Sequence, residues 1–252
     1  MDINLVNQFI DRGEVVKARD SYRDLAGNKE LGEELAPTAL RLVVALRQRG
    51  FYEEAKDIYF SMQTLGVSEE IAVARARAAF NLFESYRKSD LLKEAGEMLD
   101  TMARLMPTDE VKLLRAMGAV NLVEALCAKD DIPRAQGVYA AMELLGDSEE
   151  ISVVRATAAI ALLTARAEKK ARAECDELFR SIESLGDFED VSYVRAKACC
   201  VLTDLYVNTG DLAAAKNMFA YLGKLVEAWP DLWSYQDEVF GIIYNATGET
   251  EF

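Results

Sequence analysis

The sequence predicts an all-α protein in which helix pairs stack on one another, and three observations support this prediction. Apolar residues recur every 40 residues along most of the 252-residue chain. Each repeat holds two amphipathic segments whose apolar residues are spaced as on one face of an α-helix. Short turn segments separate these helices, and no segment alternates as a β-strand does. We therefore expect a single elongated repeat domain that spans residues 1–252.

The second helix of each repeat carries three columns, which are sets of residues at equivalent positions in successive repeats. The alanine column consists of Ala55, Ala95, Ala135, Cys175 and Ala215. The aromatic column, four positions later, consists of Tyr59, Leu99, Tyr139, Phe179 and Phe219. The third column, three positions further on, consists of Met62, Met102, Met142, Ile182 and Leu222. This spacing puts all three columns on one helix face, so we expect the methionines to be core residues and not an adaptable binding surface.

The first helix of each repeat carries a leucine column and a column of small residues. The leucines are Leu42, Leu82, Leu122, Leu162 and Leu202. The small residues, three positions earlier, are Ala39, Ala79, Ala119, Ala159 and Cys199. Small side chains on an apolar face allow two helices to approach closely, so this face is expected to be buried.

Turn and capping residues divide the chain into 13 predicted helices. Their ranges are 2–12, 14–27, 31–49, 52–66, 69–88, 91–106, 109–128, 131–146, 149–168, 171–186, 189–208, 211–227 and 231–246. They form six pairs, 2–27, 31–66, 69–106, 109–146, 149–186 and 189–227, followed by the terminal helix 231–246. The expected N-caps are Ser68, Thr108 and Ser148, and the expected left-handed residues at helix C-termini are Gly66, Gly146 and Gly186.

These columns resemble the consensus of the tetratricopeptide repeat (TPR) family, which has Leu and a small residue in its first helix and Ala and an aromatic residue in its second. The resemblance extends to Ala18 and Tyr22, includes one family-type proline, Pro107, and covers about residues 2–227. The period matches the long 40-residue variant, although larger residues replace the family glycine at Val43, Phe83, Val123, Leu163 and Thr203. The resemblance implies a right-handed α-α superhelix of about six helix pairs plus a C-terminal helix.

The charge of the chain restricts its partners. It contains 43 acidic and 29 basic residues, for a formal net charge of -14. Such a charge repels nucleic-acid phosphates and anionic lipids, so we expect neither a nucleic-acid nor a membrane partner. It also disfavours the related pentatricopeptide repeat family, which reads single-stranded RNA with a basic groove.

The location predicted from the sequence is the cytoplasm. No run of about 20 apolar residues is present to span a membrane, and the first residues lack the basic segment of a signal peptide. The cysteines Cys127, Cys175, Cys199 and Cys200 lie within apolar helical patterns. We expect them to be buried and reduced, as in a reducing compartment.

The TPR resemblance implies that first helices line a concave groove that binds a partner. The candidates on that face are Arg77, Asn81, Glu84, Asn121, Glu124, Thr157, Lys197 and Asp204, with Met117, Thr164 and Val201 beside them. Some TPR proteins hold the C-terminal carboxylate of heat-shock chaperones with a base and Asn four residues apart, then another Asn, then two bases. Arg77, Asn81 and Asn121 match the first part of this pattern. Thr157 and Ala161 stand where the two bases should be, so we expect a different partner.

A column of four arginines also recurs near the start of the first helices. This arginine ladder consists of Arg75, Arg115, Arg155 and Arg195. It could bind an acidic peptide, or each arginine could pair with an acid of a neighbouring helix. The acids considered for such pairs are Glu69, Asp109, Glu149 and Glu189, with Glu70, Glu110, Glu150 and Asp190 next to them. We favour the structural role because so many acids are available.

The C-terminal helix has apolar residues on more than one side. Its aromatic residues, together with one tryptophan just ahead of it, are Trp229, Trp233, Phe240 and Tyr244. An apolar surface of this kind often marks an interface, so a homodimer or a partner contact through this helix is one interpretation. The alternative is a bulky cap that covers the last repeat.

The sequence predicts a protein without catalytic function, cofactor or metal. It has no histidine, the commonest general base, and it lacks the Gly-rich phosphate loop, the GxSxG motif and the CxxC motif. We expect an adaptor or scaffold that binds a partner peptide or helix in the groove. Two alternatives remain open: a self-associating structural subunit that uses the C-terminal helix, and a regulatory module that senses a ligand or peptide.

Overall fold

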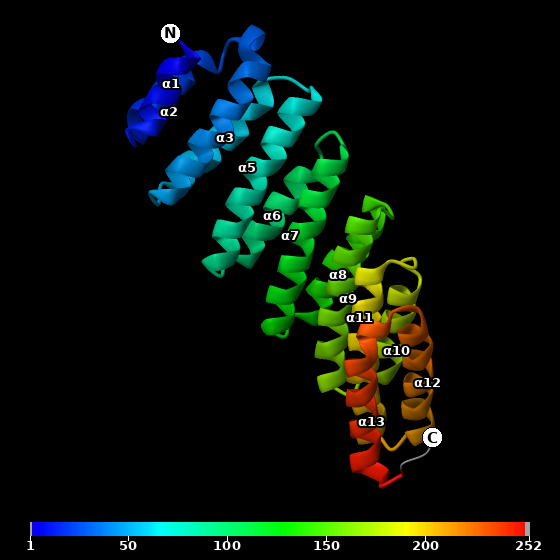
Figure 1. The fold of residues 1–252 in the computed structure, drawn as a ribbon. Coiled ribbons are helices and arrows are strands. Elements are labelled where there is room, and N and C mark those ends of the chain that lie inside the picture. The colour runs from blue at the N-terminus through cyan, green and yellow to red at the C-terminus, as the bar shows by residue number, and fades with distance from the viewer. Residues whose placement is uncertain (1, 250–252) are drawn as a thin grey trace. The chain divides into compact units, whose positions relative to one another are not determined.

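The computed structural model describes residues 2–249, and within these residues the chain is all-helical, without strands (Figure 1). The α-helices of the first half are α1 Ile3–Asp11, α2 Val15–Leu25, α3 Gly32–Gln48, α4 Tyr52–Ser61, α5 Glu69–Lys88, α6 Leu92–Met102 and α7 Asp109–Ala128. Those of the second half are α8 Ile132–Ala141, α9 Glu149–Glu168, α10 Arg172–Glu183, α11 Glu189–Asn208, α12 Leu212–Ala228 and α13 Trp233–Thr247. The prediction of an all-α chain with 13 helices in neighbouring pairs is confirmed.

The second helices of several repeats are shorter than expected. Helices α4 and α8 end at Ser61 and Ala141, about a turn before the predicted ends, and continue as the 3₁₀ helices η2 (Met62–Thr64) and η3 (Met142–Leu145). A 3₁₀ turn satisfies the last carbonyl groups with tighter hydrogen bonds, which is common at helix ends. The first helices α5, α7, α9 and α11 have the bounds that the sequence predicts.

Side-chain caps begin several of the first helices. Ser68, Thr108 and Ser148 accept hydrogen bonds from the backbone N–H groups of the residues three positions later, at 3.5, 3.2 and 3.4 Å. These three N-cap predictions are confirmed. The preceding glycines Gly66 and Gly146 have φ of 132° and 100°, a region that favours residues without a Cβ.

The chain divides into two compact units, Met1–Gly118 (unit 1) and Ala119–Phe252 (unit 2), with the division inside α7. In unit 1 the first helices α1, α3 and α5 form a row, and α2 and α4 each contact the helix before and the helix after them. Unit 2 repeats this arrangement, with α9, α11 and α13 in a row and with α10 and α12 each packed against two of them. Helix α13 therefore occupies the place of a first helix within unit 2.

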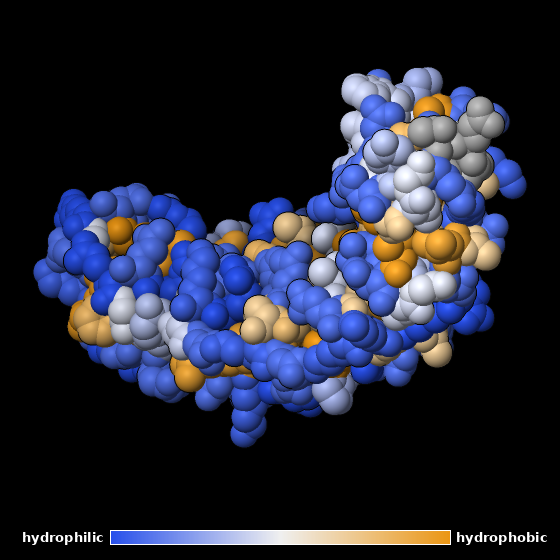
Figure 2. All heavy atoms as spheres, turned by 90° about the horizontal axis from the view of Figure 1, so that it is seen from below, coloured by the Kyte–Doolittle hydropathy of each residue, from blue (hydrophilic) through white to orange (hydrophobic). Residues whose placement is uncertain are grey.

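The recurring columns form the core of each unit. The five leucines of the first helices are at most 2% exposed, and Met62, Met102 and Met142 at most 1%. The methionines are thus core residues, as predicted. Burial of each leucine stabilises the fold by about 1.5–3 kcal/mol. The surface visible in Figure 2 is mostly hydrophilic, with apolar side chains in patches. Among residues 2–249, none of the helices is long and apolar enough to cross a membrane.

Candidate functional site

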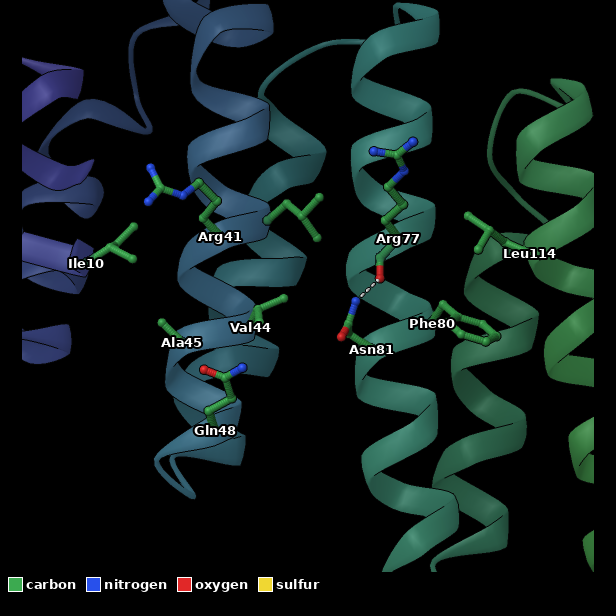
Figure 3. A pocket seen from close by; sticks show the side chains of 10 residues that line it. Ile10, Arg41, Val44, Ala45, Gln48, Arg77, Phe80, Asn81 and Leu114 are labelled. Atoms are coloured by element: carbon green, nitrogen blue, oxygen red, sulfur yellow. Dashed lines mark hydrogen bonds between the residues drawn. The ribbon is translucent and has the colours of Figure 1, made fainter. Parts of the chain in front are cut away.

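An open groove of about 510 Å³ runs across the first helices of unit 1 (Figure 3). The residues that line this unit-1 groove are Ile10 on α1; Leu40, Arg41, Val44, Ala45 and Gln48 on α3; Arg77, Phe80 and Asn81 on α5; and Leu114 on α7. Each helix of the row contributes at least one side chain, because residues three, four and seven apart lie on one helix face. The groove thus combines an apolar floor with four polar side chains.

The apolar floor of the unit-1 groove comes from side chains that point from one helix towards the next. In Figure 3, Ile10 points from α1 towards α3, Val44 from α3 towards α5, and Phe80 from α5 towards Leu114. The ring of Phe80 also stacks on Phe83, with 5.9 Å between centroids. Phe80 is only partly buried, so one face of its ring is accessible from the groove.

Two of the predicted partner-binding residues, Arg77 and Asn81, lie in this groove. Arg77 Nε donates a hydrogen bond to Glu110 Oε1 at 2.5 Å, and Asn81 Nδ2 donates one to the Arg77 carbonyl oxygen at 2.9 Å. The Asn81 carbonyl oxygen accepts a long hydrogen bond of 3.4 Å from Arg47. Asn81 Oδ1 makes no hydrogen bond to the described part of the chain, so it is available as an acceptor.

The positive charges of the unit-1 groove are already paired. Arg41 donates to Asn7 Oδ1 at 2.6 Å and to Asp11 Oδ1 at 2.5 Å, which turns its guanidinium towards α1. Arg77 is paired with Glu110 in the same way. These arginines therefore lack the uncompensated charge that a site for a free carboxylate needs.

A second groove, the unit-2 groove, has a volume of about 570 Å³ and lies between α9, α11 and α13. Its lining residues are Thr164, Ala167, Glu168, Lys170, Cys200, Val201, Asp204, Leu205, Asn208, Glu238 and Ile242. It holds three carboxylates and one ammonium group. Asp204 Oδ2 accepts a hydrogen bond from Asn208 Nδ2 at 2.9 Å. Burial, with a contribution from the Glu238 carboxylate, raises the pKa of Cys200 to about 12, so this thiol is a poor nucleophile at neutral pH.

The other predicted partner-binding residues are accessible but are not gathered in one site. Glu84 accepts two hydrogen bonds from Arg87, at 3.0 and 2.8 Å. Thr157 Oγ1 donates to the Val153 carbonyl oxygen of its own helix. The remaining members of the set, Asn121, Glu124 and Lys197, are partly or fully exposed and line neither groove. None of the eight residues is buried.

Several residues of the unit-1 groove were missed from the sequence, although a signal for them exists. Arg41 and Val44 lie 40 positions before Asn81 and Glu84, which were predicted. They occupy the equivalent positions one repeat earlier, so the 40-residue period is enough to identify them. Phe80 has no polar group and reads as an ordinary core residue, so only its exposure in the structure identifies it.

Two arginines of the ladder, Arg155 and Arg195, bind the end of the preceding second helix or the turn after it. Arg195 is 4% exposed and donates to Asp187 Oδ1 at 3.1 Å and to the carbonyl oxygens of Glu183 and Gly186 at 2.8 and 2.5 Å. Arg155 likewise donates to Asp147 at 3.0 Å. These acids lie in the turns, whereas the sequence pointed to acids at the helix starts.

The other two arginines of the ladder are partly buried. Burial lowers the pKa of Arg115, and the Asp100 carboxylate opposes that shift. Arg75 lies close enough to Tyr59 to lower the pKa of that phenol, although burial of the phenol dominates and raises its pKa. The burial and the intrachain contacts of these arginines favour a structural role over a row of free anion-binding groups.

The aromatic residues at the C-terminal helix differ in exposure. Trp233 is 60% exposed and Tyr244 is 45% exposed, whereas Trp229 and Phe240 are partly buried. The Phe240 ring stacks on Tyr244, with 6.1 Å between centroids, and lies 6.3 Å from the Phe219 ring of α12. These residues all belong to unit 2.

The fold and the two grooves define a helical repeat protein with accessible clefts along its first helices. No cluster of His, Cys, Asp and Glu that could hold a metal ion occurs among residues 2–249. No protein-family model, curated protein or solved structure matches the chain. Its function therefore has to be inferred from these surfaces.

Proposed function

We propose that this protein is a non-enzymatic adaptor of the TPR type that binds a partner peptide or helix in the unit-1 groove. The observation that carries the proposal is the groove itself, in which an apolar floor from α1, α3, α5 and α7 is bordered by polar side chains. Concave sites of about 300–1,000 Å³ with an apolar lining and a few polar groups are typical of ligand-binding sites in proteins.

The chemistry of the groove favours a largely uncharged segment. Val44 and Phe80 offer apolar contact area, while Asn81 Oδ1 and the Gln48 amide offer hydrogen bonds to a peptide backbone. The charges of Arg41 and Arg77 are compensated by Asp11 and Glu110. A partner with apolar side chains and free backbone groups fits this surface better than an acidic peptide does.

The TPR assignment is part of the same proposal. It is supported by the buried leucine and alanine columns and by the row of first helices in each unit, which recur at the 40-residue spacing. A right-handed superhelix would continue the row through all the repeats. Such an arrangement leaves first helices on the concave side, where partners of this class bind.

The test is a selection of peptides against the intact protein, followed by affinity measurements on groove variants. Peptides enriched from a displayed random library are titrated by calorimetry into the wild type and into Val44→Asp and Asn81→Ala. A buried carboxylate at position 44 should weaken binding by about tenfold or more, and loss of the amide by less. Val67→Asp, at an 82% exposed position outside the groove, is the matched control. Equal affinities for the Val44→Asp variant and the wild type would show that the groove is not the binding site.

A further inference from the structure

The C-terminal helix α13 carries an aromatic stripe, which we define as Trp233, Phe240 and Tyr244. Successive residues of an α-helix are turned by about 100°, so spacings of seven and four bring these side chains to within about 40° of one another. Trp233 and Tyr244 are 60% and 45% exposed, and the planes of Phe240 and Tyr244 are inclined by only 8°. Trp233 and Tyr244 thus give the stripe an exposed aromatic surface, with the partly buried Phe240 between them in the sequence.

The opposite flank of α13 packs against α11. Cys200 Sγ on α11 lies 3.8 Å from the Tyr235 carbonyl oxygen, and Glu238 and Ile242 line the groove that α13 shares with α11. These three α13 residues lie on the far side of the helix from Trp233 and Phe240 by the same geometry. The aromatic stripe therefore points away from α11, along the direction in which the row of first helices would continue.

The 40-residue repeat shows which residues of α11 are equivalent to those of the aromatic stripe on α13. Tyr193, Cys200 and Asp204 of α11 lie 40 positions before Trp233, Phe240 and Tyr244. Cys200 and Asp204 line the flank of α11 that faces α13. Tyr193 belongs to the same flank, because the Asp231 carboxylate adds to the effect of burial in raising its pKa. The aromatic stripe therefore occupies the flank through which a first helix of unit 2 receives the next helix of the row.

The charge around the stripe favours a basic occupant. The acid beside the stripe is Asp237, four residues after Trp233, and α13 contains no basic residue. Asp237 is exposed and makes no ion pair within the described residues. Exposed faces of Trp and Tyr also attract ammonium and guanidinium groups. A second copy of this chain would instead bring the same acids together, with a net charge of -14 on each side.

We propose that the aromatic stripe of α13 docks an amphipathic helix of another protein, one whose apolar ridge is flanked by Lys or Arg. The docked helix extends the row of first helices by one position. Its apolar ridge covers Trp233, Phe240 and Tyr244, and a basic residue on its flank faces Asp237. The stripe belongs to unit 2 and the proposed peptide groove to unit 1, so the two sites share no residue.

A synthetic peptide tests the proposal directly. The probe is a helical peptide of about 18 residues, long enough to lie along α13, with Leu on one face and Lys on the flanks. Two companions have the same length, one with Glu in place of Lys and one with the order scrambled. Binding is followed by calorimetry and by the fluorescence of the two tryptophans. The basic peptide should bind at least about tenfold more tightly than either companion.

Variants of the chain then locate the site. The double substitution Trp233→Ser and Tyr244→Ser leaves the net charge unchanged and should weaken binding of the basic peptide by about tenfold or more. Leu144→Ser, at an 84% exposed position, is the matched control, and Val44→Asp checks the unit-1 groove; neither should change the affinity. Circular dichroism establishes that each variant is folded.

Four results would overturn the proposal. The first is undiminished affinity of the double variant for the basic peptide. The second is equal affinity of the wild type for the basic and the glutamate peptides. The third is a dimeric mass in light scattering that the double substitution converts to a monomer, because the occupant of the stripe would then be a second copy. Loss of peptide binding in Val44→Asp alone would move the site to the groove and contradict the proposal as well.

Discussion

Tyr59 donates a hydrogen bond to Thr101 across the interface between α4 and α6, with 2.7 Å between Tyr59 Oη and Thr101 Oγ1. The threonine hydroxyl in turn donates to the Met98 carbonyl oxygen at 2.7 Å. The same relay recurs at Tyr139 and Ser181, whose hydroxyl oxygens lie 2.9 Å apart. Burial raises the pKa of Tyr59, so this phenol stays a donor over the neutral range. Each relay ties one second helix to the next.

Removing the Tyr59 hydroxyl should therefore destabilise the protein. We expect Tyr59→Phe to lower the free energy of unfolding by about 1 kcal/mol, because one buried hydrogen bond is lost while the ring remains. Tyr52→Phe, at a 41% exposed position, is the control and should change stability little. Urea unfolding measures both. A double-mutant cycle with Thr101→Val isolates the pair, and strictly additive effects of the two changes would contradict a direct interaction.

Of the two residues in each relay, the sequence predicted the position of one. The aromatic column was predicted to face the core, since it recurs at Tyr59 and Tyr139. Its hydrogen-bond partner was missed, although the sequence holds a signal for it: the partner position carries Ser61, Thr101, Ala141, Ser181 and Tyr221 in successive repeats. Each tyrosine of the aromatic column is followed one repeat later by Ser or Thr at this position, whereas Leu99 is followed by Ala141. Whether the two hydroxyl groups form a hydrogen bond depends on how closely the two second helices pack.

The turns between helices also contain residues that the sequence indicates and one that only the structure reveals. Gly50, Asp90, Asp130 and Gly210 share one turn position, and the structure adds Lys170 with φ of 56°. Lysine has no preference for positive φ, so its own identity predicts nothing. Only the 40-residue period connects it with the others. In the candidate site, likewise, Arg77 and Asn81 followed from the family pattern, whereas the role of Phe80 required the structure.

Gly32 and Gly137 should respond in opposite ways to replacement by alanine. A Cβ at Gly32 would lie 2.0 Å from the Leu65 carbonyl oxygen, a backbone atom that cannot move aside alone. Gly32→Ala should therefore destabilise the protein by about 1–3 kcal/mol or more. A Cβ at Gly137 in α8 meets nothing within 4 Å, so Gly137→Ala should stabilise it by about 0.5–1 kcal/mol. Thermal unfolding distinguishes the two, and a shift of the same sign for both variants would contradict this explanation.

Arg195 should contribute more to stability than Arg155, although both belong to the arginine ladder. Arg195→Met keeps the side-chain stem but leaves the Glu183 and Gly186 carbonyl oxygens without a donor, which should cost about 2–3 kcal/mol. For Arg155, the bond to the 87% exposed Asp147 is a surface-type contact, so Arg155→Met should cost about 1 kcal/mol or less. Denaturant midpoints test the order. Unchanged stability in Arg195→Met would reopen a ligand-binding role for the ladder.

Alkaline pH should destabilise the protein partly through Cys175. Burial raises the pKa of Cys175 from its ordinary value of 9.0 to about 11, so the folded state favours the neutral thiol. Because the folded pKa is the higher one, this contribution is complete below pH 9 and is lost as the pH rises towards about 11. We expect the melting temperature of Cys175→Ala to fall less steeply than that of the wild type over this interval. Parallel profiles for the two proteins would show that the thiol does not titrate in this way.

The four thiols should react at two very different rates in the native protein. Burial raises the pKa of all four thiols. Cys175, Cys199 and Cys200 are buried as expected, whereas the expectation was wrong for Cys127, which is partly exposed. The thiolate is the reactive form, and the reagent must also reach it. Cys200 lines the unit-2 groove, but its pKa of about 12 leaves almost no thiolate at pH 8, and Cys175 and Cys199 can react only when the fold opens. At pH 8, Ellman's reagent should modify one thiol per chain rapidly and the other three slowly. Cys127→Ser should remove the fast phase, and urea should merge all phases into one. A fast phase that survives in Cys127→Ser would mean that one of the three buried sites opens without global unfolding.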